Sequence, residues 1–160
     1  MRADLDGAPA IALARIRCAL AGASFEVASE YAATYVDNRN PSLTSLAAFV
    51  DGAPVALDAI AAGSVVTLAV GWSDDSPESF PVLDPLSQTL VTHRESMTVS
   101  WLASDGVLAA ANTGRAEDDA ALFTTTTWTA PATAGVAHLF VALRDSRGGV
   151  DFASYDVTVR

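Results

Sequence analysis

Few of the residues that usually carry chemistry occur in this sequence: among 160 residues there are one cysteine, two histidines and no lysine. The single Cys18 excludes an intramolecular disulfide. His93 and His138 stand 45 positions apart without metal-ligand spacing, which argues against a zinc or other transition-metal centre. The sequence also has no nucleophile-elbow, P-loop or dinucleotide-binding motif. We therefore expect a protein that is not an enzyme and needs no resident cofactor.

Positive charge and long apolar runs are scarce as well. Nine arginines face 19 acidic residues, so the formal net charge is -10. Without a basic patch to neutralise phosphates, no nucleic-acid partner is expected. No apolar stretch reaches the roughly 20 residues of a transmembrane helix, so no membrane span is expected.

The segment around Cys18, ARIRCALAG, has the small residues and cysteine of a lipoprotein cleavage site. Arg15 and Arg17 interrupt its apolar run, and acidic residues stand where a signal peptide carries positive charge. We therefore expect no signal peptide and no lipobox in this chain. We interpret Met1 as a position inside a longer reading frame or a cut chain, and residues 9–20 as a strand or a short helix.

Alternation of apolar and polar residues with a period of two is the most frequent pattern in the sequence. In residues 97–103, Met97, Val99 and Trp101 fall on one face of an extended chain and Thr98 and Ser100 on the other, which predicts a strand with one buried face. The predicted strands cover residues 43–49, 55–57, 64–72, 97–103, 124–129, 136–144 and 152–159. Short turn signals separate them, a pattern typical of all-β sandwiches and barrels.

Two local predictions accompany this pattern. Residues 28–38 fit a helix, with Ser29 as a candidate N-cap, and fit a strand equally well. Gly148 and Gly149 are expected to supply the positive φ of a tight turn between the last two strands.

Several short signals, in a fixed order, resemble bacterial immunoglobulin-like repeats of the polycystic-kidney-disease type (PKD-like repeats). They are GSVVTL at 63–68, WSDD at 72–75, VSW at 99–101, TWTAP at 127–131, LRDSRGG at 143–149 and VTV at 157–159. The resemblance covers residues 40–160 and leaves residues 1–39 as an N-terminal extension, the remnant of a longer chain. The stretch 76–95 is longer than the corresponding turn of such repeats.

The resemblance implies an immunoglobulin-like antiparallel β-sandwich in an extracellular or cell-envelope protein, including lipoproteins. It also implies that Trp101 is a core residue and that the partners are neighbouring domains of a longer surface protein. On this basis we expect a non-catalytic structural or spacer module. The alternative is an adhesion module that binds a protein or a glycan through loops at one end of the sandwich, with 76–95 as the preferred region.

Acidic residues provide the only candidate ligand set. Asp74, Asp75 and Glu78 follow one strand and Asp145 follows another, so their oxygens meet at one sandwich end and provide hard ligands for Ca²⁺. The competing interpretation makes them solvated loop charges that support turns, with Asp145 bonding the backbone of its own turn. Because these acids stand in polar loops, no burial is expected to raise their pKa, which disfavours a glycosidase.

Trp128 is the one candidate ligand-binding aromatic residue. It is flanked by threonines and followed by Ala-Pro at a strand end, where half-exposed rings are common. A core position is the competing interpretation, and it is the favoured one.

Overall fold

The structure is a computed structural model that describes residues 2–5, 8–11, 20 and 22–160. It divides into two units, residues 1–35 with 83–91, and residues 36–82 with 92–160. Cys18 and most of segment 9–20 lie outside the described residues. The first unit contains an antiparallel pair, β1 (Arg2–Leu5) and β2 (Ala8–Ile11), and one helix, α1 (Phe25–Thr34). No helix among the described residues is long and apolar enough to cross a membrane.

Helix α1 decides between the two interpretations of segment 28–38. Ser24 is the N-cap, because its hydroxyl accepts the backbone N–H of Val27 over 3.3 Å, so the expected cap at Ser29 is wrong. Tyr31 and Tyr35, four positions apart, bring their ring centroids within 5.2 Å. The helix ends at Thr34, and Tyr35 is already extended.

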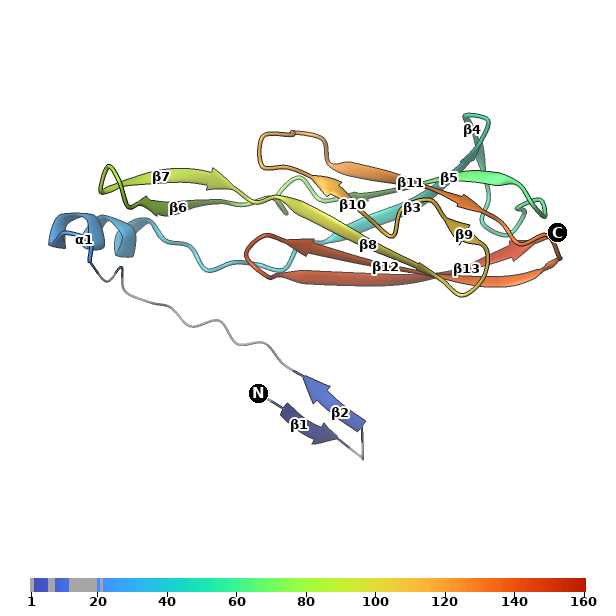
Figure 1. Cartoon of the computed structure of the whole chain (residues 1–160), viewed down its shortest axis with the longest axis horizontal. Coiled ribbons are helices and arrows are strands. Elements are labelled where there is room, and N and C mark those ends of the chain that lie inside the picture. The colour runs from blue at the N-terminus through green and yellow to red at the C-terminus, as the bar shows by residue number, and fades with distance from the viewer. Residues whose placement is uncertain (1, 6–7, 12–19, 21) are drawn as a thin grey trace. The chain divides into compact units, whose positions relative to one another are not determined.

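The second unit is an antiparallel β-sandwich, which confirms the predicted fold class (Figure 1). One sheet has five strands in the order β4 (Ala53–Val55), β3 (Leu43–Val50), β5 (Val65–Trp72), β11 (Phe123–Thr129) and β9 (Val107–Leu108). The other has four, in the order β10 (Asn112–Arg115), β8 (Met97–Ala103), β12 (Gly135–Asp145) and β13 (Val150–Val159).

The strand order is that of immunoglobulin sandwiches. Strands β3, β5 and β11 take the places of strands A, B and E, and β8, β12 and β13 those of C, F and G. Residues 57–62 run beside the end of β13, where Ile60 and Val159 form a parallel bridge. The long stretch 76–95 lies between the B and C positions and forms a hairpin of β6 (Ser79–Asp84) and β7 (Thr89–Arg94), with its turn at residues 85–88.

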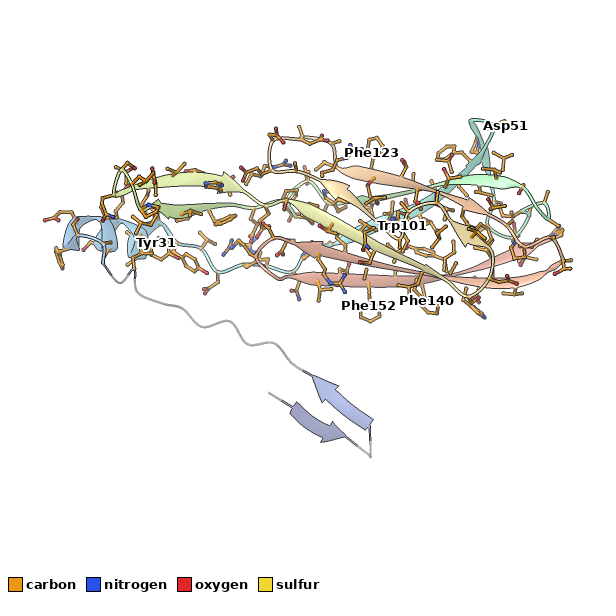
Figure 2. All side chains as sticks on the ribbon, viewed as in Figure 1. Tyr31, Asp51, Trp101, Phe123, Phe140 and Phe152 are labelled. Atoms are coloured by element: carbon orange, nitrogen blue, oxygen red, sulfur yellow. The ribbon has the colours of Figure 1, made fainter. Side chains whose placement is uncertain are left out.

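Alternating residues of both sheets face each other and form the core, as the sequence pattern predicted. Trp101 is 3% exposed, and its indole N–H donates to the Thr113 hydroxyl over 2.8 Å. Figure 2 shows Trp101 between the two sheets. The fully buried side chains include Val66, Leu68, Val70, Met97, Val99, Leu139, Val141, Leu143 and Val157.

Two turn predictions need correction. Between β12 and β13 only Gly148 has a positive φ, of 90°. Gly149 is required for another reason, since a Cβ there would collide with Asp145 Oδ2 and lie 3.0 Å from the carbonyl of Arg39. The strand expected at 55–57 lies at 53–55, because Asp51 and Gly52 both adopt positive φ and turn the chain directly into β4.

Candidate functional site

Three segments meet at one end of the sandwich: residues 36–42 before β3, the loop from β5 through the hairpin to β8, and the β12–β13 turn. The backbone N–H of Ser42 donates to the Ser76 hydroxyl over 2.9 Å, and that of Leu43 donates to Asp151 over 2.8 Å. The predicted meeting of two acidic loops at one end is therefore observed. The contacts centre on four side chains, Glu78, Glu95, Asp145 and Arg147, which we call the acidic cluster.

Glu95 is the innermost member of the acidic cluster and is 0% exposed. Its Oε2 accepts the backbone N–H of Glu78 over 3.0 Å, and its own N–H donates to the Glu78 carbonyl over 2.9 Å. Glu95 Oε1 accepts no hydrogen bond from any described residue and lies 3.6 Å from Arg147 Nη1. Glu95 thus joins the two chains of the hairpin at its base with a carboxylate that water does not reach.

Arg147 supplies the positive charge of the acidic cluster. Its side chain is 9% exposed, and Nη1 lies 3.6 Å from both Glu78 Oε2 and Glu95 Oε1. Nη2 donates to the carbonyl of Val36 over 2.6 Å, and the guanidinium stands over the Phe80 ring, 4.9 Å from its centroid. A planar group with several donors suits this combination of two carboxylates, a carbonyl and a ring. Arg147 therefore connects the β12–β13 turn with the hairpin and with the segment that leads into β3.

Asp145 organises its own turn, as one of the two interpretations predicted. Its Oδ1 accepts the backbone N–H groups of Arg147 and Gly149 over 2.8 and 2.7 Å, and Asn38 donates to Oδ2 over 3.0 Å. Asp145 is only 6% exposed, so the expectation of a solvated loop carboxylate is wrong for this residue. The turn buries it because its oxygens satisfy the backbone donors.

Burial raises the pKa of the Glu95 carboxyl from its ordinary 4.5 to about 7, and the negative charges of Asp145 and Glu78 contribute to the rise. The backbone N–H of Glu78 and the guanidinium of Arg147 act in the opposite direction. Glu95 therefore changes its charge close to neutral pH. Because Glu95 has no exposed surface, its charge acts on the surrounding protein groups. The contacts that hold the hairpin base therefore change in strength with pH.

The four predicted calcium ligands are not gathered into one group. Glu78 and Asp145 both belong to the acidic cluster, but Asp74 and Asp75 are exposed in the turn after β5. Within the described part of the chain, no three His, Cys, Asp or Glu side chains are grouped so that they hold a metal ion. Arg147 provides the cation between Glu78 and Glu95 instead. Calcium binding by this end of the sandwich stays a prediction.

The Trp128 side chain is fully buried, with 0% exposure. Its indole N–H donates to the carbonyl of Asp105 over 3.0 Å, and Gly106 packs so closely that a Cβ there would collide with the indole. The ring has no free face for a ligand, so the core interpretation of Trp128 agrees with the structure and the half-exposed, ligand-binding one does not. The reason is that β9 pairs with the last two residues of β11 and brings the preceding turn, with Asp105 and Gly106, against the indole.

Neither Glu95 nor the central role of Arg147 was predicted from the sequence. Glu95 stands in the polar run His93-Arg94-Glu95-Ser96, which looks like an ordinary solvated loop. Its only signal is its position directly before a strongly alternating strand, where a hairpin base can cover it.

Comparisons with known proteins leave the family open. No protein-family model matches the chain, and a search of curated proteins finds no significant match. Among solved structures, the chain is similar to a lipoprotein from Bacteroides thetaiotaomicron, with 12% sequence identity and a TM-score of 0.37 over 76% of this chain and 84% of that one.

Proposed function

We propose that this chain is a non-catalytic structural module of an extracellular or cell-surface bacterial protein, of the PKD-like immunoglobulin type, which spaces the domains on either side of it. The proposal is carried by one observation, that the sandwich is entered and left at opposite ends. Val36 lies beside the β12–β13 turn through its bond with Arg147, and β13 then runs away from that turn to Arg160 (Figure 1). Ten strand residues span about 30 Å. A module with this path extends a chain of domains in one direction.

The exit strand is anchored in a way that resists tension along this path. Residues 57–62 and the end of β13 exchange four backbone hydrogen bonds of 2.8 to 3.1 Å: Ile60 N to Thr158 O, Thr158 N to Leu57 O, Arg160 N to Ile60 O, and Ala62 N to Arg160 O. The two segments are parallel. A pull on Arg160 therefore loads these bonds together, in shear, instead of opening them one after another.

Single-molecule stretching of the chain between reference domains tests this proposal. We expect residues 36–160 to unfold in one event with a contour gain of ~40 nm. Ala62→Pro removes the backbone N–H that donates to the Arg160 carbonyl. Position 62 accepts proline because residues 61–64 form a turn, in which Ser64 N–H donates to the Ala61 carbonyl and Gly63 has a φ of +71°. We expect this variant to unfold at lower force with little change in the free energy of unfolding. Gradual extension without a distinct event would contradict the spacer role.

An adhesion module is the second candidate function, and the hairpin is the observation in its favour. The hairpin occupies the place of the B–C loop, one of the ligand-contacting loops of immunoglobulin variable domains. Leu86 in its turn is 95% exposed, and the acidic cluster holds its base. A long excursion fixed to a rigid scaffold is a common site of binding.

Glycan-array binding with and without Ca²⁺ tests this second candidate. If the hairpin binds a glycan, a variant with residues 80–93 replaced by a short turn should lose the array signal. Leu86→Ser removes only one apolar contact and should weaken the signal without abolishing it. A signal that needs Ca²⁺ would support the calcium prediction. Binding that survives removal of the hairpin would exclude it as the site.

A further inference from the structure

The outward side of the four-stranded sheet carries large apolar side chains in the open. Phe152 is 79% exposed, Leu102 60% and Phe140 49%. Figure 2 shows Phe140 and Phe152 projecting to the same side, away from Trp101 and the core. We call this surface the outer face. It consists of Thr98, Ser100, Leu102, Asn112, Gly114, Val136, His138, Phe140, Ala142, Arg144, Val150, Phe152, Ser154, Asp156 and Thr158.

The register of the strands places large and small residues of the outer face in two adjacent rows. In one row Phe140 lies between Leu102 and Ser154, and in the next Ala142 lies between Ser100 and Phe152. Each of β8, β12 and β13 thus contributes one large and one small side chain. The pairs are Leu102 with Ser100, Phe140 with Ala142, and Phe152 with Ser154.

We propose that the outer face is a two-fold interface between two copies of this chain. A two-fold axis that lies in the face, perpendicular to the strands and between the two rows, exchanges the rows. Phe140 then meets Ala142 of the second copy, and the same holds for the pairs on β8 and β13. Each phenylalanine thus faces a small side chain, while Leu102 faces Ser100 and the Arg144 guanidinium that donates to its hydroxyl over 2.9 Å. Large against small is the complementarity that closely packed aligned sheets require.

The charges of the outer face obey the same symmetry. Next to the two central rows lie His138 with Asp156 on one side and Arg144 with Val150 on the other. His138 Nδ1 and Asp156 Oδ1 are 2.7 Å apart. The axis brings Arg144 of one copy opposite the His138–Asp156 pair of the other. With neutral histidine the face carries one positive and one negative charge, although the chain as a whole carries -10, so two copies meet here without like-charge repulsion.

The size of the outer face is sufficient for a dimer. Residues 136–144 of β12 extend ~27 Å, and β8, β12 and β13 side by side are ~14 Å wide, so each copy contributes roughly 400 Å² of planar area, and more once β10 and interdigitating side chains are included. A standard interface buries about 800 Å² per partner. The dimer is expected to be reversible, at the lower end of this class.

Sedimentation velocity of the full chain at micromolar to near-millimolar concentration tests the interface. We expect the mass to rise with concentration from 16.5 kDa to twice that value. Phe152→Ser removes a large residue, and Ala142→Arg fills the space opposite Phe140, so each should weaken the dimer at least about tenfold. Val65→Ser, on β5 of the other sheet where Val65 is 58% exposed, is the matched control and should leave it unchanged.

A charge exchange tests the symmetry itself. Arg144→Asp and Asp156→Arg should each weaken the dimer, and the double variant should recover it, because the axis places Arg144 of one copy over His138 of the other and next to Asp156, its neighbour on β13. Circular dichroism confirms that each variant is folded. A monomer at every concentration, a dimer indifferent to Phe152→Ser and Ala142→Arg, or a double variant no stronger than the single ones would overturn the proposal. None of these results bears on the spacer role, which the stretching experiment measures separately.

Discussion

The free energy of unfolding should fall as the pH rises from about 4.5 to about 7.5, and Glu95→Gln should remove much of this fall. Below pH 4.5 the Glu95 carboxyl is protonated in both the folded and the unfolded chain. Between 4.5 and the folded pKa of about 7 only the unfolded chain releases the proton, so folding loses stability with rising pH. Above the folded pKa the loss is complete. We expect a total of roughly 2 to 3 kcal/mol, with solvent screening by the surrounding loops favouring the lower value.

Urea unfolding at several pH values between 4 and 8.5 measures this effect. Glutamine keeps the shape of the protonated carboxyl and can still accept the N–H of Glu78, so the variant should match the parent protein at pH 4.5 and exceed its stability at pH 8. Asp75→Asn is the matched control, since it removes an exposed carboxylate from the same loop and should give a curve parallel to that of the parent. Parallel curves for the parent and Glu95→Gln would show that Glu95 is not buried as described.

Arg147→Met should destabilise the sandwich by about 3 to 5 kcal/mol at pH 8, because it removes the cation from two carboxylates, one of them fully buried. The loss should be smaller at pH 5, where Glu95 keeps its proton. It should also be smaller in a Glu95→Gln background, which a double-mutant cycle measures. Arg147→Lys should recover only part of the stability, because an ammonium lacks the planar donors that reach Val36 and stack on Phe80.

Arg39→Met is the control for the arginine prediction. Arg39 Nε lies 3.8 Å from Glu78 Oε1, so it shares a carboxylate with Arg147, but its side chain is 77% exposed. An ion pair in water contributes at most about 1 kcal/mol. Equal losses from Arg39→Met and Arg147→Met would show that burial does not distinguish the two arginines.

Together these variants ask whether the hairpin base is a rigid part of the sandwich. If the acidic cluster loosens above neutral pH, the contacts at the base of the hairpin weaken, which affects the adhesion candidate more than the spacer role. The exit strand and its four hydrogen bonds lie at the other end of β13, and their strength should not follow the charge of Glu95.

Much of the sandwich was predictable because strand alternation is a local property. A strand with one face in the core must place every second residue there, so Met97, Val99 and Trp101 on β8 identify their own buried face. The turn residues are local as well: Asp145 bonds the backbone two and four positions ahead, within reach of its own side chain. Local pattern alone could not distinguish a helix from a strand at 25–34. Tyrosines four positions apart lie on one face of a helix and also on one face of a strand.

Tertiary structure alone decided what lies between the strands. Glu95 is buried because residues 78, 145 and 147, far from it in the chain, close over it, and Trp128 is buried because the turn before β9 packs against its indole. The pairing of Phe140 with Ala142 across a dimer axis likewise depends on the register between strands, which alternation within one strand does not encode. The sequence by itself determined which face of each strand turns inward, because that depends on neighbours along the chain. Charge burial and surface complementarity depend on neighbours in space, and only the fold brings those together.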